Sequence, residues 1–510
     1  MLSEIHTSGL MGIDGFEVHT QTDISNGMPA FEIVGLPDAA VKEAKERIKA
    51  AVRNSGYAVP PKRIIINLSP ASMRKEGPSY DLPMAVSILD ASEQIHVSDR
   101  DDSVFIGELG LDGRVHSVTG VLPMVISSYK AGYHKMYVPA DNAREAAVID
   151  GVEIYPVKTL RELIDHFSEV SYIQPLKVDM KDIMESTSVS MLDFSDVKGQ
   201  ESAKRALEIA AAGGHNIIMI GSPGTGKTML AQRICTILPD MSFEEALEVT
   251  KIHSIAGILR NDTPLITERP FRSPHHTVST VGLSGGGTIP RPGELSLAHN
   301  GVLFLDEFPE FKRDALEVMR QPLEDGEVTI SRVDATLTYP CNIMLVASMN
   351  PCKCGYYGDK TRQCSCTSAD VQRYRNRISG PMLDRIDIQV EVEGVNYNDL
   401  SSVEKGETSA QIKKRVDTAR KIQLERYKDY GIYSNSQLTA GMIQEFCRLG
   451  EEENKILKTA FENLGLSARA HSRILKVART IADLDGSENI CKKHIFEAIQ
   501  YRSLDRKFFA

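Results

Sequence analysis

Hydrophobic and polar positions follow three successive patterns along the chain. Residues 1 to about 172 alternate short Val/Ile runs, such as 63–68, with helical patterns, such as 38–52. From 193 to about 395 strand-like and helical patterns alternate again, and beyond about 397 the pattern is mostly helical with basic faces. We therefore expect an α/β protein with an N-terminal domain at 1–172, a linker at 173–192, a parallel-sheet core at 193–396 and a C-terminal helical domain at 397–510.

A phosphate-binding loop lies between an apolar run at 216–220 and a helical pattern at 229–233. Residues 221–228 match G-x-x-x-x-G-K-[ST] in the strand–loop–helix setting that the motif requires. Its glycines let backbone N–H groups face phosphate oxygens, and the helix N-terminus adds its positive end. We expect Lys227 to reach the β- and γ-phosphates and Thr228 to hold Mg²⁺. The predicted nucleotide-binding residues are Gly221, Ser222, Pro223, Gly224, Thr225, Gly226, Lys227 and Thr228.

A second motif supplies the carboxylates that the first one needs. The apolar run 301–305 predicts a buried strand, and it ends in Asp306 and Glu307. We expect Asp306 to lie in the outer coordination sphere of Mg²⁺ and Glu307 to polarise the attacking water. The two motifs together predict a nucleoside triphosphatase.

Two further polar positions follow the pattern of such an enzyme. Asn350 ends the predicted strand 342–349, where the carboxyl edge of a parallel sheet binds ligands. It is a candidate for orienting the lytic water or sensing the γ-phosphate, although an Asn-Pro pair alone favours a turn. Arg385, between Asp384 and Asp387, is either a local ion-pair partner or an arginine finger that acts on a neighbour's phosphate.

Composition sets the surroundings of this chemistry. At 510 residues the chain predicts two to four domains, and 25% charged with 42% hydrophobic residues is typical of a soluble globular protein. No 18-residue apolar run and no basic-then-apolar N-terminus occurs, so we expect a cytoplasmic protein without a membrane partner. The net charge of −10 argues against a broadly basic surface, but it leaves open nucleic acid held in a narrow channel.

Several segments together resemble the AAA+ ATPases. They are 193–200, the two phosphate motifs, the Asn-Pro strand end and 380–387; segments 210–216, 269–276 and 350–352 resemble the magnesium-chelatase-like branch. Within that branch nearly the whole chain is similar to the ComM/YifB family. The resemblance implies a homo-hexameric ring that binds ATP and Mg²⁺ between subunits, with Arg385 as a finger in trans. It also implies that Arg469 is the second sensor, and Arg473, one helical turn on, is an alternative for that role.

The same resemblance implies where DNA would be handled. The family carries an insertion and a hairpin that face the ring's pore, here at 281–288 and 328–338. The candidate DNA-contacting residues are Gly285, Gly286, Gly287 and Arg291 in or beside the insertion, and Arg332 in the hairpin. Alternatively the glycines form a flexible loop and Arg332 pairs with a nearby acid.

Four of the eight cysteines form two C-x-C pairs, Cys352 with Cys354 and Cys364 with Cys366. Disulfides are disfavoured in a cytoplasmic protein, so the clustered thiols indicate either a metal site or no ligand. Four thiolates can hold a structural Zn²⁺, but the usual spacing within each pair is wider. The pattern is therefore compatible with zinc without being diagnostic of it.

The N-terminal region resembles the Lon-type proteases at 75–81 and 107–115, which implies a Lon-like, ribosomal S5 domain 2-like α+β domain. The position of the catalytic lysine falls at Leu122, and Lys130 is eight residues too late to replace it. Because Ser79 then has no base to take its proton, we expect this domain to be proteolytically inactive.

Two functions remain open at this point. The resemblance implies an ATP-dependent DNA motor, a hexameric helicase that drives branch migration in recombination or natural transformation. The alternative is a protein-remodelling or magnesium-chelatase-like AAA+ ATPase that does not act on DNA. An ATP-dependent protease is disfavoured by Leu122.

Overall fold

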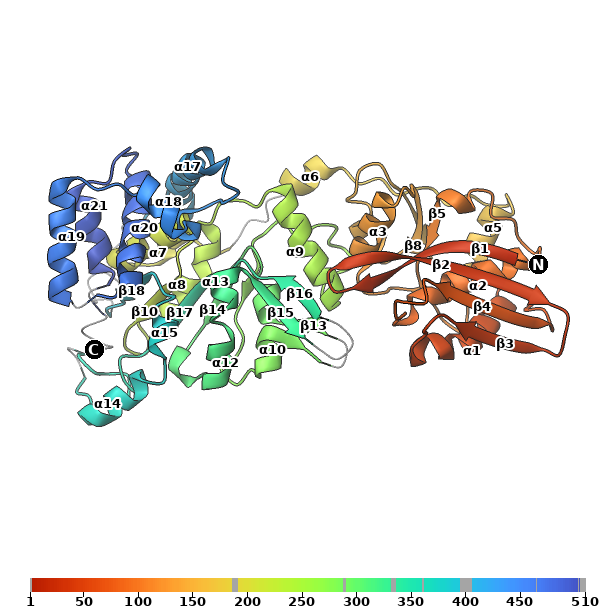
Figure 1. The fold of residues 1–510 in the computed structure, drawn as a ribbon, viewed down its shortest axis with the longest axis horizontal. Helices are drawn as coiled ribbons and strands as arrows, with labels where there is room; N and C mark the ends of the chain where they lie inside the picture. Colours follow the sequence, from red (N-terminus) through yellow and green to blue (C-terminus); the bar gives the residue numbers. More distant parts are fainter. Residues whose placement is uncertain are drawn as a thin grey trace. The chain divides into compact units, whose positions relative to one another are not determined.

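The computed structural model describes residues 2–185, 191–287, 290–331, 336–359, 362–394, 406–464, 466–502 and 504 (Figure 1). Contacts divide the chain into two compact units. The first unit comprises Met1–Thr187, Ser242–Thr267 and Ser331–Tyr339, and the second comprises Ser188–Met241, Glu268–Ile330 and Pro340–Ala510. Both are mixed α/β structures, and the second contains the parallel sheet that the sequence predicts. The predicted domain boundaries stay predictions.

A seven-stranded sheet forms the centre of the first unit, in the order β3-β4-β2-β1-β5-β8-β9. The pairs β1–β2 and β2–β4 are antiparallel, and the other neighbours run parallel. In β4 every second residue is buried, so Ile64, Ile66 and Leu68 share one face. The strands are β1 (Leu2–Met11), β2 (Asp14–Ser25), β3 (Ala30–Val34), β4 (Arg63–Ser69), β5 (Ser103–Phe105), β8 (Lys135–Pro139) and β9 (Glu153–Val157); β6 (Glu108–Leu109) and β7 (Val115–His116) form a separate pair.

The helices of this unit follow from capping and periodicity. Helix α1 spans Ala39–Asn54, where the sequence predicts 38–52, and Asp38 caps it by accepting a bond from the Val41 N–H at 2.8 Å. Its buried residues recur at helical spacing, so one face joins the core. The other helices are α2 (Asp81–Ala91), α3 (Val121–Lys130), α4 (Ala143–Ala146), α5 (Leu160–Phe167) and α6 (Met180–Glu185).

Helix α9 (Phe243–Ala256) belongs to the first unit although it follows the phosphate loop in the sequence. Ser242 and Glu245 form a capping box at its start. The helix packs against α3, and the Ser254 hydroxyl donates to the Glu145 carboxylate at 2.6 Å. A segment that sequence order places among the nucleotide motifs therefore packs with the N-terminal residues.

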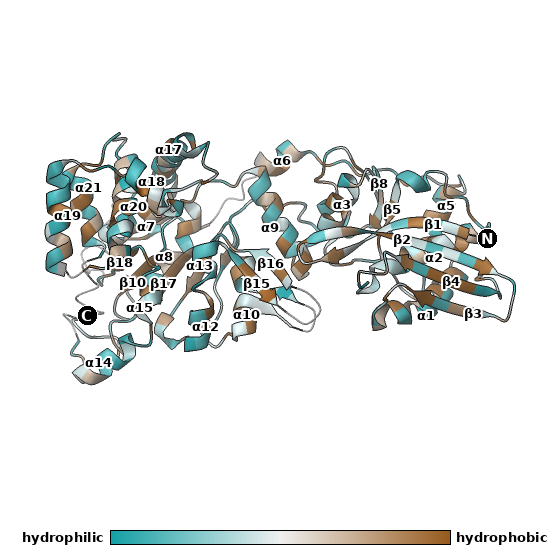
Figure 2. Ribbon diagram, viewed as in Figure 1, coloured by the Kyte–Doolittle hydropathy of each residue, from teal (hydrophilic) through white to brown (hydrophobic). Residues whose placement is uncertain are grey.

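Five parallel strands form the sheet of the second unit, in the order β11-β14-β17-β10-β18. Every residue of β10, β14 and β17 is buried, and these strands are strongly hydrophobic in Figure 2. Helices on a parallel sheet cover both of its faces, which explains runs that do not alternate. The strands are β10 (Ile217–Ile220), β11 (Phe271–Arg272), β14 (Val302–Leu305), β17 (Met344–Met349) and β18 (Ile388–Glu391).

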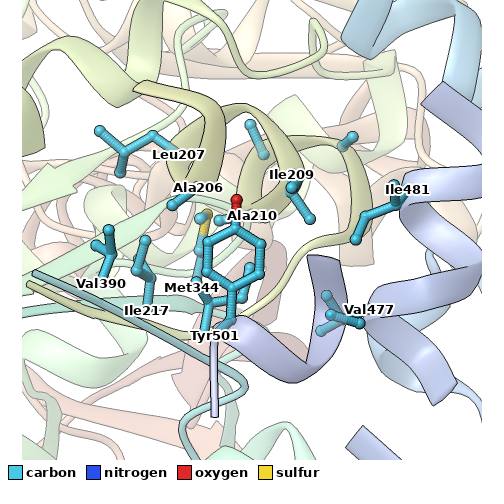
Figure 3. Packing of buried hydrophobic residues seen from close by; sticks show 14 of the residues in the cluster. Ala206, Leu207, Ile209, Ala210, Ile217, Met344, Val390, Val477, Ile481 and Tyr501 are labelled. Atoms are coloured by element: carbon cyan, nitrogen blue, oxygen red, sulfur yellow. The ribbon is translucent and has the colours of Figure 1, made fainter. Parts of the chain in front are cut away.

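The hydrophobic core of this unit joins the sheet to the C-terminal helices. Figure 3 shows Ala206 and Ala210 of α7 near Tyr501, with Val477 and Ile481 of α20 beside them. The small alanines let α7 approach its neighbours closely. The helices are α7 (Glu201–Gly213), α8 (Lys227–Arg233), α10 (Thr280–Ser284), α11 (Glu294–Leu297), α12 (Arg313–Val318), α13 (Pro322–Asp325), α14 (Ser368–Arg375), α15 (Gly380–Leu383), α17 (Ser409–Tyr427), α18 (Ala440–Phe446), α19 (Glu451–Leu464), α20 (Ala468–Leu484) and α21 (Lys492–Gln500).

Two short two-stranded sheets accompany these elements: β12 (Gly285–Gly286) with β13 (Arg291–Pro292), and β15 (Glu327–Ser331) with β16 (Thr336–Pro340). Among the described residues, no helix has the length and the apolar character needed to span a membrane.

Candidate nucleotide-binding site

The phosphate loop connects β10 to α8, as the sequence predicts. Gly224 and Gly226 have φ angles of 79° and 83°, which a side chain rarely tolerates, and Gly226 caps the start of α8. The Thr225 hydroxyl closes the turn by donating to the carbonyl of Ser222 at 2.9 Å. The loop therefore presents its backbone N–H groups together with the N-terminus of a helix, the arrangement that binds phosphate.

Lys227 lies inside this loop among neutral oxygen atoms. Its ammonium group donates to the carbonyls of Gly221 at 2.7 Å and Ser222 at 3.0 Å, and to Oδ1 of Asn350 at 3.2 Å. Burial lowers the pKa of Lys227 to about 8, although Asp306 and Glu307 oppose that shift. A polyphosphate would supply the negative charge that this buried cation lacks, so the residues fit the predicted ligand.

Thr228 and Asp306 face each other where Mg²⁺ is predicted. The Thr228 hydroxyl donates to Oδ2 of Asp306 at 2.9 Å, and the Ser348 hydroxyl donates to the other carboxylate oxygen. Hydroxyl and carboxylate oxygens are the ligands that Mg²⁺ takes in such sites. Ser348 was not predicted; it precedes Asn350 by two residues on β17, so its side chain emerges on the same face.

Glu307 adopts a strained backbone conformation. Its φ of 53° is left-handed, which costs a residue with a side chain about 1 kcal/mol or more. The Glu307 side chain is 54% exposed, and Nδ1 of His276 lies 3.4 Å from its Oε2. His276 was noted in the sequence only as part of a family segment, and its contact with Glu307 required the fold.

The order of the strands explains why the polar residues converge. Strand β17 lies between β10 and β14, and the register pairs Ile220 with Met349 and Leu305 with Ala347. Asn350 therefore follows β17 at the same edge where the phosphate loop and Asp306 begin. The sheet brings together the three motifs that the sequence places far apart.

A cleft of about 450 Å³ is lined by residues of three segments, none of which belongs to the phosphate loop. Gln200, which lines it, donates from Nε2 to the carbonyls of Thr225 at 2.5 Å and Glu393 at 3.3 Å. Val390, Val392 and Tyr501 give part of the lining apolar or aromatic character. The cleft thus combines polar and apolar walls. Sequence reasoning did not find it, because its residues come from three distant segments.

Arg385 is buried, with 5% of its surface exposed. Its guanidinium pairs with Glu324 at 2.7 Å and donates to the carbonyls of Arg320 at 2.7 Å and Pro381 at 2.6 Å. The partner is thus a distant glutamate and not the flanking aspartates that the sequence suggested. Its predicted role as a finger stays a prediction.

Arg469 and Arg473 differ in their surroundings. The Arg469 side chain is 60% exposed and lies 3.7 Å from Asp384. Arg473 instead pairs with Asp387, a carboxylate that His215 also contacts at 3.1 Å. Burial raises the pKa of Asp387, but the Arg473 guanidinium and His215 bring it well below its usual range. Arg473 is therefore held by a structural ion pair, whereas Arg469 is accessible.

The candidate DNA-contacting residues are partly described. Gly285 and Gly286 pair with Pro292 and Arg291, and a Cβ at Gly285 would lie 2.4 Å from the Arg291 carbonyl. These glycines therefore close a hairpin and do not form an open loop. Gly287 lies beyond the pair with a φ of 107°, Arg291 is exposed, and Arg332 lies outside the described residues.

The four clustered cysteines converge in space. Their Sγ atoms all lie within 4.8 Å of one another, and the pairs among Cys352, Cys354 and Cys364 are 3.4 to 3.7 Å apart. A hydrogen bond from the Tyr356 backbone N–H lowers the pKa of the Cys354 thiol to about 5, whereas burial and the neighbouring thiols raise the pKa of Cys364 to about 12 despite a hydrogen bond from the Cys366 N–H. The arrangement is compatible with a bound metal ion.

Three residues on which the Lon-like comparison depends, Lys75, Ser79 and Leu122, are buried. Leu122 is fully buried in α3, and Ser79 is 4% exposed. The Lys75 ammonium group donates to the carbonyls of Pro70 and of Met73, the latter at 2.8 Å. The Lys75 side-chain nitrogen is therefore hydrogen-bonded to two backbone oxygens. The inactivity of this domain stays a prediction.

Family models match three parts of the chain. Residues 193–400 match "Magnesium chelatase, subunit ChlI", residues 20–142 match "Subunit ChlI of Mg-chelatase", and residues 406–502 match "Magnesium chelatase, subunit ChlI C-terminal". The matched ranges contain all the nucleotide motifs.

Proteins that are not named as magnesium chelatases match nearly the whole chain. The chain is 44% identical over 510 residues to uncharacterized protein YifB of Escherichia coli, covering 99% of this chain and 98% of the relative. It is 41% identical over 510 residues to competence protein ComM of Haemophilus influenzae, with the same coverage. The match to the magnesium-chelatase 67 kDa subunit of Chlorobaculum parvum is 28% identical and covers only 32% of this chain and 24% of that subunit.

Proposed function

Because the chain belongs to the ComM/YifB family of magnesium-chelatase-like AAA+ proteins, we propose that it is a ring-forming ATP-dependent DNA motor. The proposed ring is a homo-hexamer that drives branch migration during recombination of incoming DNA. One observation carries the DNA part of the proposal: the relative named as a competence protein matches the whole chain, whereas the chelatase subunit matches a third of it.

The hydrolytic step is assigned to the residues at the edge of the parallel sheet. Lys227 binds the β- and γ-phosphates, while Thr228 and Asp306 hold Mg²⁺. When bound, Mg²⁺ neutralises charge on the phosphate oxygens. Glu307 accepts a proton from the attacking water, and His276 and the left-handed backbone orient its carboxylate. Asn350, bonded to Lys227, senses the γ-phosphate.

Arginines complete the proposed site from outside the loop. Arg385 acts on the nucleotide of a neighbouring subunit, which requires it to exchange Glu324 for phosphate oxygens. Arg469 is the second sensor, and its exposure supports that role over Arg473. Such positive charges stabilise the transferring phosphoryl group and commonly raise turnover by a factor on the order of 10³ or more.

DNA contact is proposed for the hairpin of Gly285 and Gly286 with Arg291, and for Gly287 and Arg332. Arg291 is exposed beside glycines that bring two backbone strands close together. A phosphate contact from such an arginine would bind every sequence alike, which suits a motor that releases each base it passes. Binding should then weaken steeply with salt, because phosphate contacts release counterions.

The test compares ATPase rates of the purified protein with single-stranded, duplex and branched DNA at low salt. We expect DNA to raise the rate, and we expect strand exchange on a branched substrate only with ATP hydrolysis. Glu307→Gln should bind ATP and lose both activities. Arg291→Ala should lower DNA affinity while basal ATPase persists, and Lys458→Ala on the exposed face of α19 is the matched control.

The second candidate is an ATPase that remodels a protein or inserts a metal ion. All three family models carry the chelatase description, and one of them matches the N-terminal region, so that region does not by itself exclude chelation. ATP hydrolysis that no DNA substrate stimulates, with no DNA binding in any nucleotide state, would favour this candidate over the DNA motor.

A further inference from the structure

The segments that carry the four clustered cysteines contain no helix or strand among their described residues. They run from the end of β17 at Met349 to the start of α14 at Ser368. Cys352 is fully buried, and the other three cysteines are half-buried. Segments of this length without secondary structure are uncommon in a compact unit, and something other than backbone ladders must hold them.

The sulfur atoms have the spacing of a tetrahedral metal site. Zn–S bonds of about 2.3 Å place the sulfurs of a tetrahedron about 3.8 Å apart. The observed Sγ–Sγ distances are 3.4 Å, 3.5 Å and 3.7 Å for the three pairs among Cys352, Cys354 and Cys364, and Cys366 lies within 4.8 Å of all three. These distances are far longer than the S–S bond of a disulfide, which is about 2.05 Å. All eight cysteines are free.

The local backbone supports the same geometry. Gly355, directly after Cys354, has a φ of 90°, a left-handed conformation that glycine adopts readily. The backbone N–H of Cys366 donates to Sγ of Cys364 at 3.4 Å.

The first cysteine segment packs directly on the phosphate loop. A Cβ at Gly355 would lie 2.6 Å from the Pro223 ring, so the Gly355 backbone is in close contact with that ring. The Ser222 hydroxyl donates to the carboxylate of Asp359 at 2.6 Å. These contacts connect the loop that binds phosphate to the segment between the two cysteine pairs.

The same segment also positions the sensor residue. Asn350, which accepts a hydrogen bond from Lys227, is separated from Cys352 only by Pro351. The carbonyl of Pro351 accepts a hydrogen bond from Arg375 of α14 at 3.1 Å, and the Arg375 guanidinium lies over the Tyr357 ring at 4.8 Å. A shift of the cysteine segment would therefore move Asn350 relative to Lys227.

We propose that Cys352, Cys354, Cys364 and Cys366 bind one structural Zn²⁺ ion, and that this ion holds the cysteine segment against the phosphate loop. The four thiols release their protons to solvent as the metal binds. The ion itself lies outside the hydrolytic chemistry and acts on it by fixing Pro223, Ser222 and Asn350. This coupling rests on the proposed nucleotide site, whereas the metal site does not.

Metal content tests the proposed zinc site. Full-length wild-type protein, purified without chelators, should contain about one zinc ion per chain by elemental analysis. Cys354→Ser/Cys364→Ser should contain none, and Cys491→Ser, which changes an exposed cysteine outside the cluster, should retain it. Because the double variant can fail to fold, mercurial titration of folded wild-type protein is the second measurement. It should release about one zinc ion per chain from wild-type protein and from Cys491→Ser alike, as the cluster thiols react.

Nucleotide affinity tests the proposed coupling between the zinc site and the phosphate loop. Removing zinc from wild-type protein should weaken ATP binding at least tenfold, and adding Zn²⁺ back should restore it. Lys227→Ala should lose ATP binding and keep its zinc. Stoichiometric zinc with unchanged ATP affinity after its removal would overturn the coupling. Protein that neither contains nor takes up zinc, or that has disulfides at these cysteines, would overturn the site. Zinc-loaded wild-type protein that binds no ATP would instead refute the proposed function alone.

Discussion

Single residues decide how the phosphate loop responds to pH. Lys227 is a cation whose contacts are neutral oxygens, and burial lowers its pKa to about 8. Only the charged form attracts phosphate, so binding ATP above that pKa requires uptake of a proton. The affinity should therefore be constant below pH 8 and fall above it.

The expected fall in ATP affinity is about tenfold per pH unit well above pH 8, since each unit removes the charged form by that factor. Fluorescence titrations with a nucleotide analogue between pH 7 and 9.5 measure it. Lys227→Arg is the control, because a guanidinium stays charged over this range. Equal affinity of the wild-type protein at pH 7 and pH 9.5 would contradict the assignment of Lys227.

Arg473 and Arg469 lie on the same helix, α20, and we expect Arg473 to contribute to stability and Arg469 to ATP hydrolysis. The Asp387 carboxylate is 4% exposed and pairs with both Arg473 and His215. Without Arg473, it keeps only His215 of these two partners. We expect Arg473→Ala to destabilise the protein by about 3 kcal/mol. The largely exposed Arg469 contributes little to stability, so Arg469→Ala should leave the unfolding temperature within about a degree and abolish most ATPase activity.

Thermal unfolding and ATPase assays on both variants check this prediction. If Arg473→Ala unfolds at the wild-type temperature but loses ATPase activity, the two arginines have the opposite roles.

At the scale of elements, helix α9 packs with residues that are far from it in the sequence. Its contacts with α3 and the bond between Ser254 and Glu145 belong to the first unit. Glu145 also accepts a hydrogen bond from Asn142 at 2.6 Å, and burial raises the pKa of its carboxyl group. The Leu122 backbone N–H is a third donor to this carboxylate, so three donors share one buried acceptor.

Glu145→Ala should therefore destabilise the first unit by about 1 to 3 kcal/mol, since three buried donors lose their acceptor. Hydrogen exchange should show the loss in α9 as well as in α4, the helix that contains residue 145. Asp141→Ala, which changes an exposed acid one turn away, is the control. Protection of α9 that is unchanged in Glu145→Ala would show that apolar packing alone holds the helix.

At the scale of the whole molecule, the proposed site needs residues from two copies of the chain. Within one copy Arg385 is bonded to Glu324 and to two carbonyls, so its guanidinium is satisfied without nucleotide. In a ring, each interface would combine Lys227 of one subunit with Arg385 of the next. This arrangement can be tested by complementation.

Arg385→Ala and Lys227→Ala proteins should each be inactive alone and recover ATPase activity when mixed. At equal amounts about a quarter of the interfaces in a closed ring would combine an intact Lys227 with an intact Arg385. Co-assembly is checked by light scattering or native mass spectrometry. Mixed rings without any recovery would show that Arg385 has only the structural role seen in its pair with Glu324.

The contiguous motifs were determined by the sequence alone. The phosphate loop, the Asp306-Glu307 strand end and helix α1 depend on residues close together in the chain, where glycine conformations, capping and hydrophobic periodicity act. Tertiary structure alone decided which distant groups meet: Arg385 with Glu324, Arg473 with Asp387, His276 with Glu307, and α9 with α3. The physical reason is that a buried charge or an apolar face specifies the kind of partner it needs, whereas the order of strands and the packing of helices select which residue supplies it.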